Sequence, residues 1–121
     1  MIAWTEFLSS QGATLADGVV ADFGDSQGEL AAAESETVIA DLSQFSLIAL
    51  AGEDAQTFLH GQITNDLRGL SEKAAIFAGY LSAKGRMLAN FLVMKRDDDV
   101  LVMLPAALRE PIQKQIGRAH V

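Results

Sequence analysis

Three apolar runs in the second half of the chain, separated by short turn segments, constrain the fold most. The turns are Ser-Ala-Lys-Gly at residues 82–85, where Gly85 tolerates a left-handed backbone, and Asp-Asp-Asp at residues 97–99. Strands joined by such short connections pair antiparallel. The sequence therefore predicts a hairpin followed by a third strand, with the strands at residues 75–81, 86–95 and 100–104.

One further strand and two helices are predicted around this meander. The apolar run at residues 45–51 is typical of a strand buried on both faces, and residues 53–62 follow it as a helix. A closing helix begins after Pro105 and can hold Pro111 only near its first turn. The order β-α-β-β-β-α indicates an α+β fold, an antiparallel sheet with helices on one face. The apolar stripes of the two helices are Ala55, Phe58, Leu59 and Ile63, and Leu108, Ile112 and Ile116.

The first part of the chain has weaker signals. Trp4, Phe7 and Leu8 have helical spacing, so residues 3–10 are predicted to form a short helix. Residues 19–23 are β-prone, and residues 24–36 are interpreted as a loop that could include a helical turn at 29–33. Residues 37–40 are predicted to form a second short strand.

Composition narrows the class of protein. The chain has 121 residues, half of them apolar, which fits one domain with a real core. There is no apolar run of about 18 residues and no basic leader, so neither a membrane helix nor a signal peptide is expected, and a cytoplasmic location is predicted. The net charge of −7 argues against direct nucleic-acid binding.

No metal site is expected. The chain has no cysteine, and its two histidines, His60 and His120, lie far apart in the sequence without a second ligand at helical spacing. His60 is predicted to lie on the solvated side of its helix. The aspartates at residues 97–99 lack the Gly and distal Glu of a calcium loop, so they are interpreted as a solvated turn.

Asn90 interrupts an otherwise apolar strand, between Leu88 and Leu92 on the same face. A buried amide costs stability unless it is hydrogen-bonded. Two interpretations stay open at this point: a satisfied amide in the core, or a polar contact inside a largely apolar ligand pocket.

Two stretches carry a resemblance to a known family: Phe-Leu-His-Gly-Gln-Ile-Thr-Asn-Asp at residues 58–66, and residues 74–95. With them the chain resembles the YgfZ-type folate-binding proteins, relatives of the glycine-cleavage aminomethyltransferase, from about Trp4 to Ile116. The resemblance implies the partial first domain of the aminomethyltransferase folate-binding fold. Residues 1–121 would be its N-terminal part, with a core at residues 37–116.

The resemblance also implies a set of folate-binding residues. Phe45 matches a position that packs against the pterin, and Phe77 matches a pocket aromatic, although both could be plain core. Asn65 and Asp66 match an Asn-Asp loop, or are simply helix-exit turn residues. Lys84 and Arg86 flank Gly85 in a turn that could meet an anion such as a folate glutamate tail, or are ordinary solvated charges. The seven implied positions are Phe45, Asn65, Asp66, Phe77, Lys84, Arg86 and Asn90.

Asn90 bears on activity, because it falls where the transferases carry a catalytic acid. Asparagine can neither take a proton nor hold a negative charge, so no catalytic residue is assigned. The resemblance then favours a tetrahydrofolate binder that supports iron–sulfur enzyme maturation or repair and tRNA modification. Its partners would be folate and iron–sulfur or tRNA-modifying enzymes. A folate-dependent aminomethyltransferase-like enzyme and a ligand-free interaction domain are the alternatives.

The pocket hypothesis depends on the hairpin register. A four-residue loop places Phe77 opposite Asn90, whereas a three-residue loop places Ala78 there, and a slip of one residue exchanges the two faces. The pocket needs the first arrangement, or a bulge with the same effect.

The chain looks shorter than a complete member of the family. The tail after residue 116 is too short for a return strand, and the family's later Lys-Gly-Cys-Tyr-x-Gly-Gln-Glu segment has no counterpart here. A fragment or a frame-shifted reading is expected, with the remainder of the protein absent. Residues 1–121 alone are then expected to bind tetrahydrofolate or a derivative weakly or not at all.

Overall fold

The chain forms two compact units, Met1–Gln44 and Phe45–Val121. The computed structural model describes residues 3–119, with the side chains of residues 118 and 119 left out. Residues 37–44, which the sequence analysis included in the core, belong to the first unit and contain no helix or strand. The predicted strand at residues 37–40 is therefore wrong, and Ile39 within it is 98% exposed.

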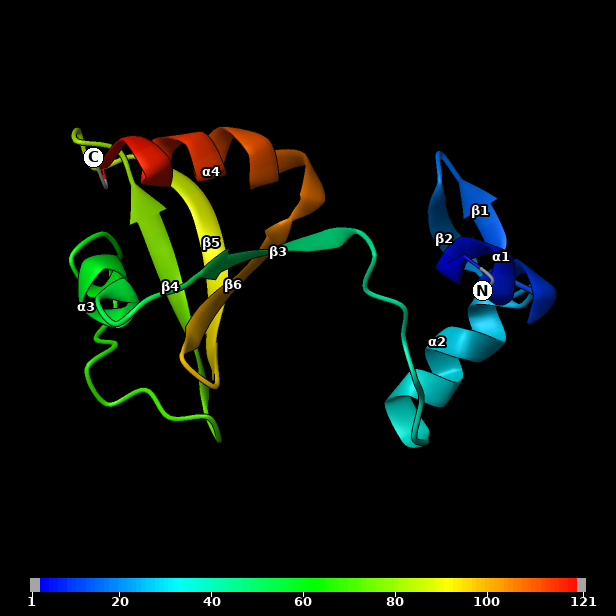
Figure 1. Ribbon diagram of the computed structural model, residues 1–121. Coiled ribbons are helices and arrows are strands. Elements are labelled where there is room, and N and C mark those ends of the chain that lie inside the picture. Colours follow the sequence, from blue (N-terminus) through cyan, green and yellow to red (C-terminus); the bar gives the residue numbers. More distant parts are fainter. Residues whose placement is uncertain (1–2, 120–121) are drawn as a thin grey trace. The chain divides into compact units, whose positions relative to one another are not determined.

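The second unit is a four-stranded antiparallel sheet with two helices (Figure 1). The strand order is β3-β6-β5-β4, so that β3 and β4 are the two edges. The elements are β3 (Phe45–Leu50), α3 (Ala55–His60), β4 (Ala75–Leu81), β5 (Met87–Arg96), β6 (Asp99–Pro105) and α4 (Ala106–Ala119). The predicted α+β architecture and the order of its elements are confirmed.

Both helices cover the same face of this sheet, and the core lies between them and the strands. Phe91, Val93 and Val102 point to this face and are fully buried, together with Leu59 of α3. Ile112 and Ile116 of α4 complete the core, as the predicted stripe requires. Helix α4 runs through Pro111.

The opposite face of the sheet is not covered by helices, which corrects the prediction for β3 and excludes one of the two interpretations of Asn90. Strand β3 was predicted to be buried on both faces, but Leu47 is 52% exposed. Along β5 burial alternates, so that Ala89 and Phe91 are buried and Asn90 between them is exposed. Asn90 is therefore not a buried amide. An antiparallel sheet needs only one covered face, which an apolar run alone does not reveal.

The register of the β4–β5 hairpin differs from both predicted arrangements. Asn90 pairs with Gly79, and Phe77 pairs with Leu92. The turn closes through Ser82 and Arg86, whose N–H···O distance is 2.8 Å. The register then shifts between Tyr80 and Leu81, which places one extra residue, Leu88, on β5. This β-bulge moves every following pair by one position.

The first unit is small and has little core. Its elements are α1 (Trp4–Ser10), β1 (Thr14–Ala16), β2 (Val19–Asp22) and α2 (Ser26–Ser35). The two strands form a hairpin through Asp17 and Gly18, which both have positive φ, as a type I′ turn requires. Leu8 is the one buried residue among the described residues of this unit.

Helix α2 occupies most of the segment that the sequence analysis interpreted as a loop. Asp25 precedes the helix, and its carboxylate accepts a hydrogen bond from the Gly28 N–H. Glu29 in turn accepts a bond from the Asp25 N–H at 2.9 Å. This reciprocal arrangement resembles a capping box and explains why the helix begins here despite the Gly and Ser residues.

Candidate ligand-binding face

The uncovered face of the four-stranded sheet, called the open face below, carries a row of apolar side chains from edge to edge. The pairings join Leu47 of β3 to Met103 of β6, Met103 to Leu92 of β5, and Leu92 to Phe77 of β4. Residues directly opposite one another in a sheet point to the same side. Phe77 is 77% exposed and Leu47 52%, so this row presents apolar surface to solvent.

The next row contains the other two open-face residues implied by the resemblance. Phe45 pairs with Pro105 at one edge, and Asn90 pairs with Gly79 at the other. Asn90 is a diagonal neighbour of Phe77, at about 7–8 Å between Cα atoms. Phe45 lies on β3, two strands away from the β5 strand of Asn90 and roughly 14 Å from β4. Phe77 and Asn90 thus form one cluster, and Phe45 lies apart from it on the same face.

The Asn90 side chain is available for an external partner. It is exposed, and it makes no side-chain hydrogen bond to any residue within the range 3–119. Gly79 opposite it is closely surrounded, since a Cβ there would lie 3.1 Å from Met87 Cε and 3.3 Å from Thr64 Oγ1. The amide therefore lies among apolar neighbours with its hydrogen-bonding capacity unused.

Asn65 has a structural role at the edge of the sheet. Its Nδ2 donates to the Phe77 carbonyl oxygen at 2.9 Å. The adjacent Thr64 N–H donates to the Gly79 carbonyl at 3.0 Å, and the Gly79 N–H donates to Thr64 Oγ1 at 2.7 Å. The loop after α3 is thereby bound along β4. It provides hydrogen-bond partners for some of the backbone groups of this edge strand, which carries Phe77.

Asp66 belongs to a compact polar cluster in the same loop. The Arg68 guanidinium donates to both of its carboxylate oxygens, with Nη2–Oδ2 at 2.7 Å and Nε–Oδ1 at 3.0 Å. These bonds, and a further one from the Arg68 N–H, hold the pKa of the Asp66 carboxyl well below its ordinary value of 3.8. The same pairing raises the pKa of Arg68.

His60 joins this cluster, contrary to the prediction of a solvated side chain. It is half-buried, and its Nδ1 accepts the Leu67 N–H at 3.1 Å. The same nitrogen lies 3.5 Å from Asp66 Oδ1. Sequence reasoning missed His60, Thr64 and Arg68, although their positions within and beside the Gly-Gln-Ile-Thr-Asn-Asp stretch were a usable signal.

Lys84 and Arg86 lie in the β4–β5 turn, at one end of the open face. Both are exposed, and neither forms an ion pair with any residue that the structure describes. They are four to six residues along the chain from Asn90. The turn therefore offers two positive charges that no described residue neutralises, at the end of the strands that carry Phe77 and Asn90.

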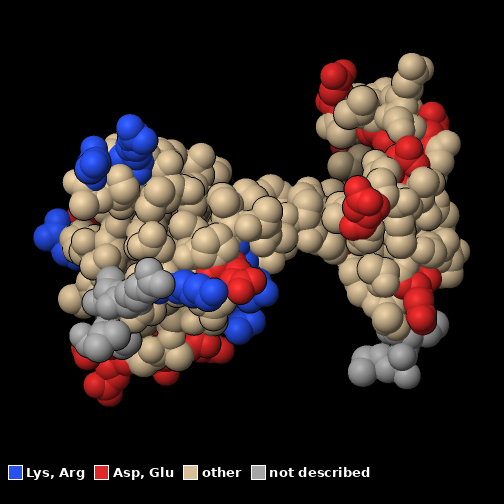
Figure 2. Space-filling model, turned by 90° about the horizontal axis from the view of Figure 1, so that it is seen from above, with Lys and Arg blue, Asp and Glu red and all other residues tan. Residues whose placement is uncertain are grey.

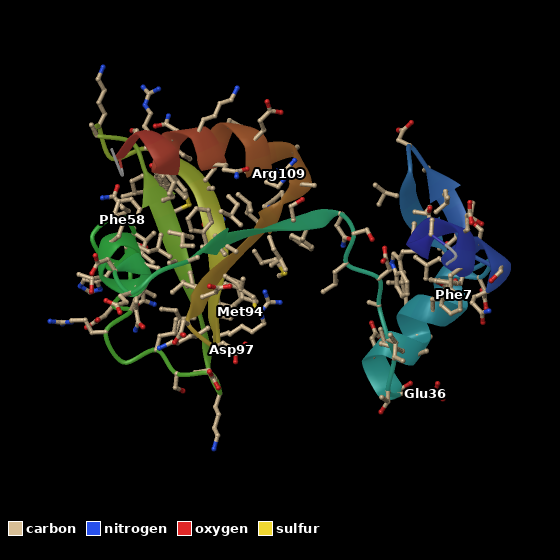
Figure 3. All side chains as sticks on the ribbon, in the orientation of Figure 1. Phe7, Glu36, Phe58, Met94, Asp97 and Arg109 are labelled. Atoms are coloured by element: carbon tan, nitrogen blue, oxygen red, sulfur yellow. The ribbon has the colours of Figure 1, made fainter. Side chains whose placement is uncertain are left out.

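A cavity of this unit lies away from the open face. This cavity, of about 380 Å³, lies on the helix side, lined by Ile48 and Leu50 of β3, Phe58 of α3 and Ile116 of α4. Figure 3 shows Phe58 on α3, and Met94 on β5 near the turn at Asp97. None of the seven implied site residues lines this cavity. Those seven lie instead on the open face, at its edge and in the adjoining turn.

Among the described residues there is no group of three or more His, Cys, Asp or Glu side chains placed to hold a metal ion. In the same part of the chain, no helix has the length and apolar character needed to cross a membrane.

Known proteins resemble this chain over part of their length. The tRNA-modifying protein YgfZ of Colwellia psychrerythraea is 31% identical over 86 residues, which is 71% of this chain and 26% of that protein. The YgfZ protein of Klebsiella pneumoniae is 36% identical over 56 residues, or 46% of this chain and 17% of the relative. An aminomethyltransferase of Alcanivorax borkumensis is 26% identical over 89 residues, or 74% of this chain and 25% of the relative. No protein-family model matches the chain.

The matched segment spans about a quarter or less of the length of each of these relatives. The resemblance inferred from residues 58–66 and 74–95 is confirmed by proteins of both kinds, the YgfZ proteins and an aminomethyltransferase. The chain is thus a relative of the YgfZ-type proteins and of an aminomethyltransferase, over part of their length.

Proposed function

We propose that the open face is one wall of a tetrahydrofolate site, in a protein that supports tRNA modification and the maturation or repair of iron–sulfur enzymes. One observation supports this most: Phe77 and Asn90 are diagonal neighbours on an uncovered apolar sheet face, and the Asn90 amide has no partner among the described residues. The names of the relatives, tRNA-modifying protein YgfZ and aminomethyltransferase, point in the same direction.

The chemistry of the face suits a pterin. A pterin ring has two flat apolar faces and a rim of hydrogen-bonding nitrogen and oxygen atoms. The exposed Phe77 ring and the Leu92 and Met103 side chains offer a surface on which such a ring can lie. The Asn90 amide can both donate to and accept from the rim. Small-molecule sites commonly combine such apolar walls with a few polar groups.

The charges fit the rest of the ligand. The glutamate portion of folate is anionic, and Lys84 and Arg86 present two positive charges at the end of the face. Asn65 and Asp66 contribute by holding the loop against β4 rather than by touching the ligand, because their polar atoms already have partners within the chain.

A single wall limits the affinity. Ligand sites normally bury about 70–90% of a drug-sized molecule, whereas a flat sheet face covers one side of it. We therefore expect residues 1–121 to bind tetrahydrofolate weakly, with the other walls supplied outside this segment. A cytoplasmic location stays a prediction.

The proposal can be tested by an anaerobic tetrahydrofolate titration of the ¹⁵N-labelled chain. We expect amide shifts centred on Phe77, Gly79, Asn90 and Leu92, with a Kd well weaker than about 1 µM. Phe77→Ala should remove these shifts, whereas Leu30→Ala, an equally exposed apolar change in the first unit, should leave them unchanged. Shifts confined to the cavity residues Ile48 and Phe58, or none at the highest soluble concentration, would count against the open face.

A second candidate is aminomethyl transfer, which the aminomethyltransferase relative favours. Asn90 cannot act as an acid or base, so we expect no one-carbon transfer. The assay would compare wild type with Asn90→Asp in the longest natural form of the protein that contains this chain. Robust turnover by the wild type would favour the enzyme over the binding protein.

A further inference from the structure

The first unit has an unusual charge. Residues 1–44 contain eight Asp and Glu side chains and no Lys, Arg or His, whereas residues 45–121 contain eight acidic and nine basic side chains. The formal charges are therefore −8 and +1, which together give the −7 of the whole chain. In Figure 2 the blue side chains all lie on the second unit.

An apolar groove runs through this acidic unit, with a volume of about 640 Å³. Its apolar lining comes from β2 and the residue after it, from α2 and from the segment after α2, and it includes Phe23, Leu30, Val38 and Ile39. Leu30 is 69% exposed and Ile39 is 98% exposed. Helix α2 has no buried residue, so its apolar side chains are not packed into a core of the unit as the structure describes it.

Three carboxylates line the same groove, and neutral donors hold all of them. Asp22 accepts bonds from the Gly24 N–H at 3.0 Å and the Ser26 hydroxyl at 2.8 Å. Glu29 accepts from the Phe23 N–H at 3.0 Å. Asp41 accepts from the Trp4 indole N–H at 2.7 Å. These bonds lower the pKa values of Asp22 and Asp41 and fix the negative charges in place without neutralising them.

We propose that this groove binds a basic amphipathic segment of a partner protein, with apolar side chains in the groove and Lys or Arg side chains beside Asp22, Glu29 and Asp41. The apolar lining explains the hydrophobic half of such a segment, and the carboxylates explain its positive charge. Nucleic acids and anionic lipid surfaces are disfavoured occupants, because a unit of charge −8 repels them. All the residues that line this groove belong to the first unit. The inference therefore does not depend on the folate-binding proposal for the open face.

Trp4 provides the reporter for a test, since it is the one tryptophan of the sequence and its indole is bonded to Asp41 in the groove. The probe is a synthetic helical peptide of Leu and Lys alone, with Leu at i, i+3, i+4 and i+7. Its titration into the whole chain should change Trp4 fluorescence with a Kd of about 1–50 µM. Raising the salt from about 0.05 M to about 0.5 M should weaken binding.

Two matched peptides and two variants separate the contribution of charge to binding from that of the apolar groove. Peptides in which Glu replaces Lys, or Ser replaces Leu, should bind at least about tenfold more weakly. The double variant Leu30→Ser with Ile39→Ser should lose a similar factor, because it removes apolar lining of the groove. Both side chains are exposed, so the circular dichroism spectrum of the variant should match that of the wild type. Leu47→Ser, an exposed change on the open face, should bind like wild type.

Several results would overturn the proposal. Equal binding of the Leu/Glu peptide, or of the Ser/Lys peptide, would show that the charge or the apolar groove plays no part. An unaltered affinity of the double variant would show that the peptide binds elsewhere. If sedimentation finds a wild-type dimer that the double variant converts to a monomer, and the Leu/Lys peptide does not bind, then the groove holds a second copy of the chain.

Discussion

The Asn65 side-chain amide donates to the Phe77 carbonyl oxygen at 2.9 Å, so the loop after α3 is bonded to the edge strand that carries the most exposed aromatic of the open face. The Asn65 Oδ1 also accepts the Asp66 N–H at 2.8 Å. One side chain therefore fixes both the loop and the edge. These two bonds give Asn65 a structural role in the loop.

Asn65→Asp should separate these two bonds. Aspartate can still accept the Asp66 N–H, but it replaces the donor by a carboxylate oxygen facing the Phe77 carbonyl. We expect the free energy of unfolding to fall by about 1 kcal/mol in urea denaturation. The same change at Asn90, which is exposed and has no bond among the described residues, should stay within about 0.5 kcal/mol of wild type. Equal effects at the two sites would contradict this assignment.

The hairpin shows how far the sequence could be used to locate the site. Apolar runs and turn residues sufficed for β4, β5 and β6, because strand periodicity and short connections are local signals. The pairing of Asn90 was mispredicted, since the bulge at Leu88 shifts the register that the Ser82–Arg86 turn sets. Whether Asn90 is buried could not be decided from the sequence, because the choice of covered face depends on where α3 and α4 pack, which is not a local property.

In the first unit, local sequence signals predicted the wrong secondary structure in two segments. Helix α2 was missed because its Gly and Ser content suggests a loop, while its start depends on the reciprocal bonds of Asp25 and Glu29. Residues 37–40 have β propensity but no strand partner. Propensity alone does not make a strand when nothing pairs with it.

Two phenylalanines on adjoining strands test which face is covered. Phe91 is fully buried against the helices, and Phe77 is 77% exposed on the open face. Phe91→Ala should cost about 3–5 kcal/mol of unfolding free energy, because it removes a ring from the core and leaves a cavity. Phe77→Ala should change it by no more than about 0.5 kcal/mol. Comparable losses in a denaturant titration would mean that the open face is covered in solution.

The Asp66–Arg68 pair should make stability depend on pH at the acid end. The folded-state pKa of Asp66 lies below its ordinary value of 3.8, so the ionised carboxylate favours the folded state above that pH. This contribution declines as pH falls below about 3.8 toward the lower folded-state value. Side-chain carboxyl NMR should therefore find a depressed pKa for Asp66 in the wild type.

Arg68→Gln supplies the control for this titration. Without the guanidinium, the Asp66 pKa should return toward 3.8, and the difference in unfolding free energy between pH 6 and pH 3 should shrink. Lys114→Gln, which affects an exposed pair with Glu110 on α4, should leave the Asp66 titration unchanged. An Asp66 pKa that is the same with and without Arg68 would show that the pair does not form in solution.

The two units should differ in how stable they are alone. Every buried residue of the core cluster lies within residues 45–121, whereas Leu8 is the one buried residue described in residues 1–44. Apolar burial is the main favourable term in folding, so the unit with little core should be the less stable of the two. We expect residues 45–121 to unfold cooperatively within about 5 °C of the whole chain. A peptide of residues 1–44 should melt at a lower temperature than residues 45–121, and its transition by circular dichroism should be broader. A midpoint for that peptide at or above that of residues 45–121 would mean that stability is distributed differently from the burial that the structure displays.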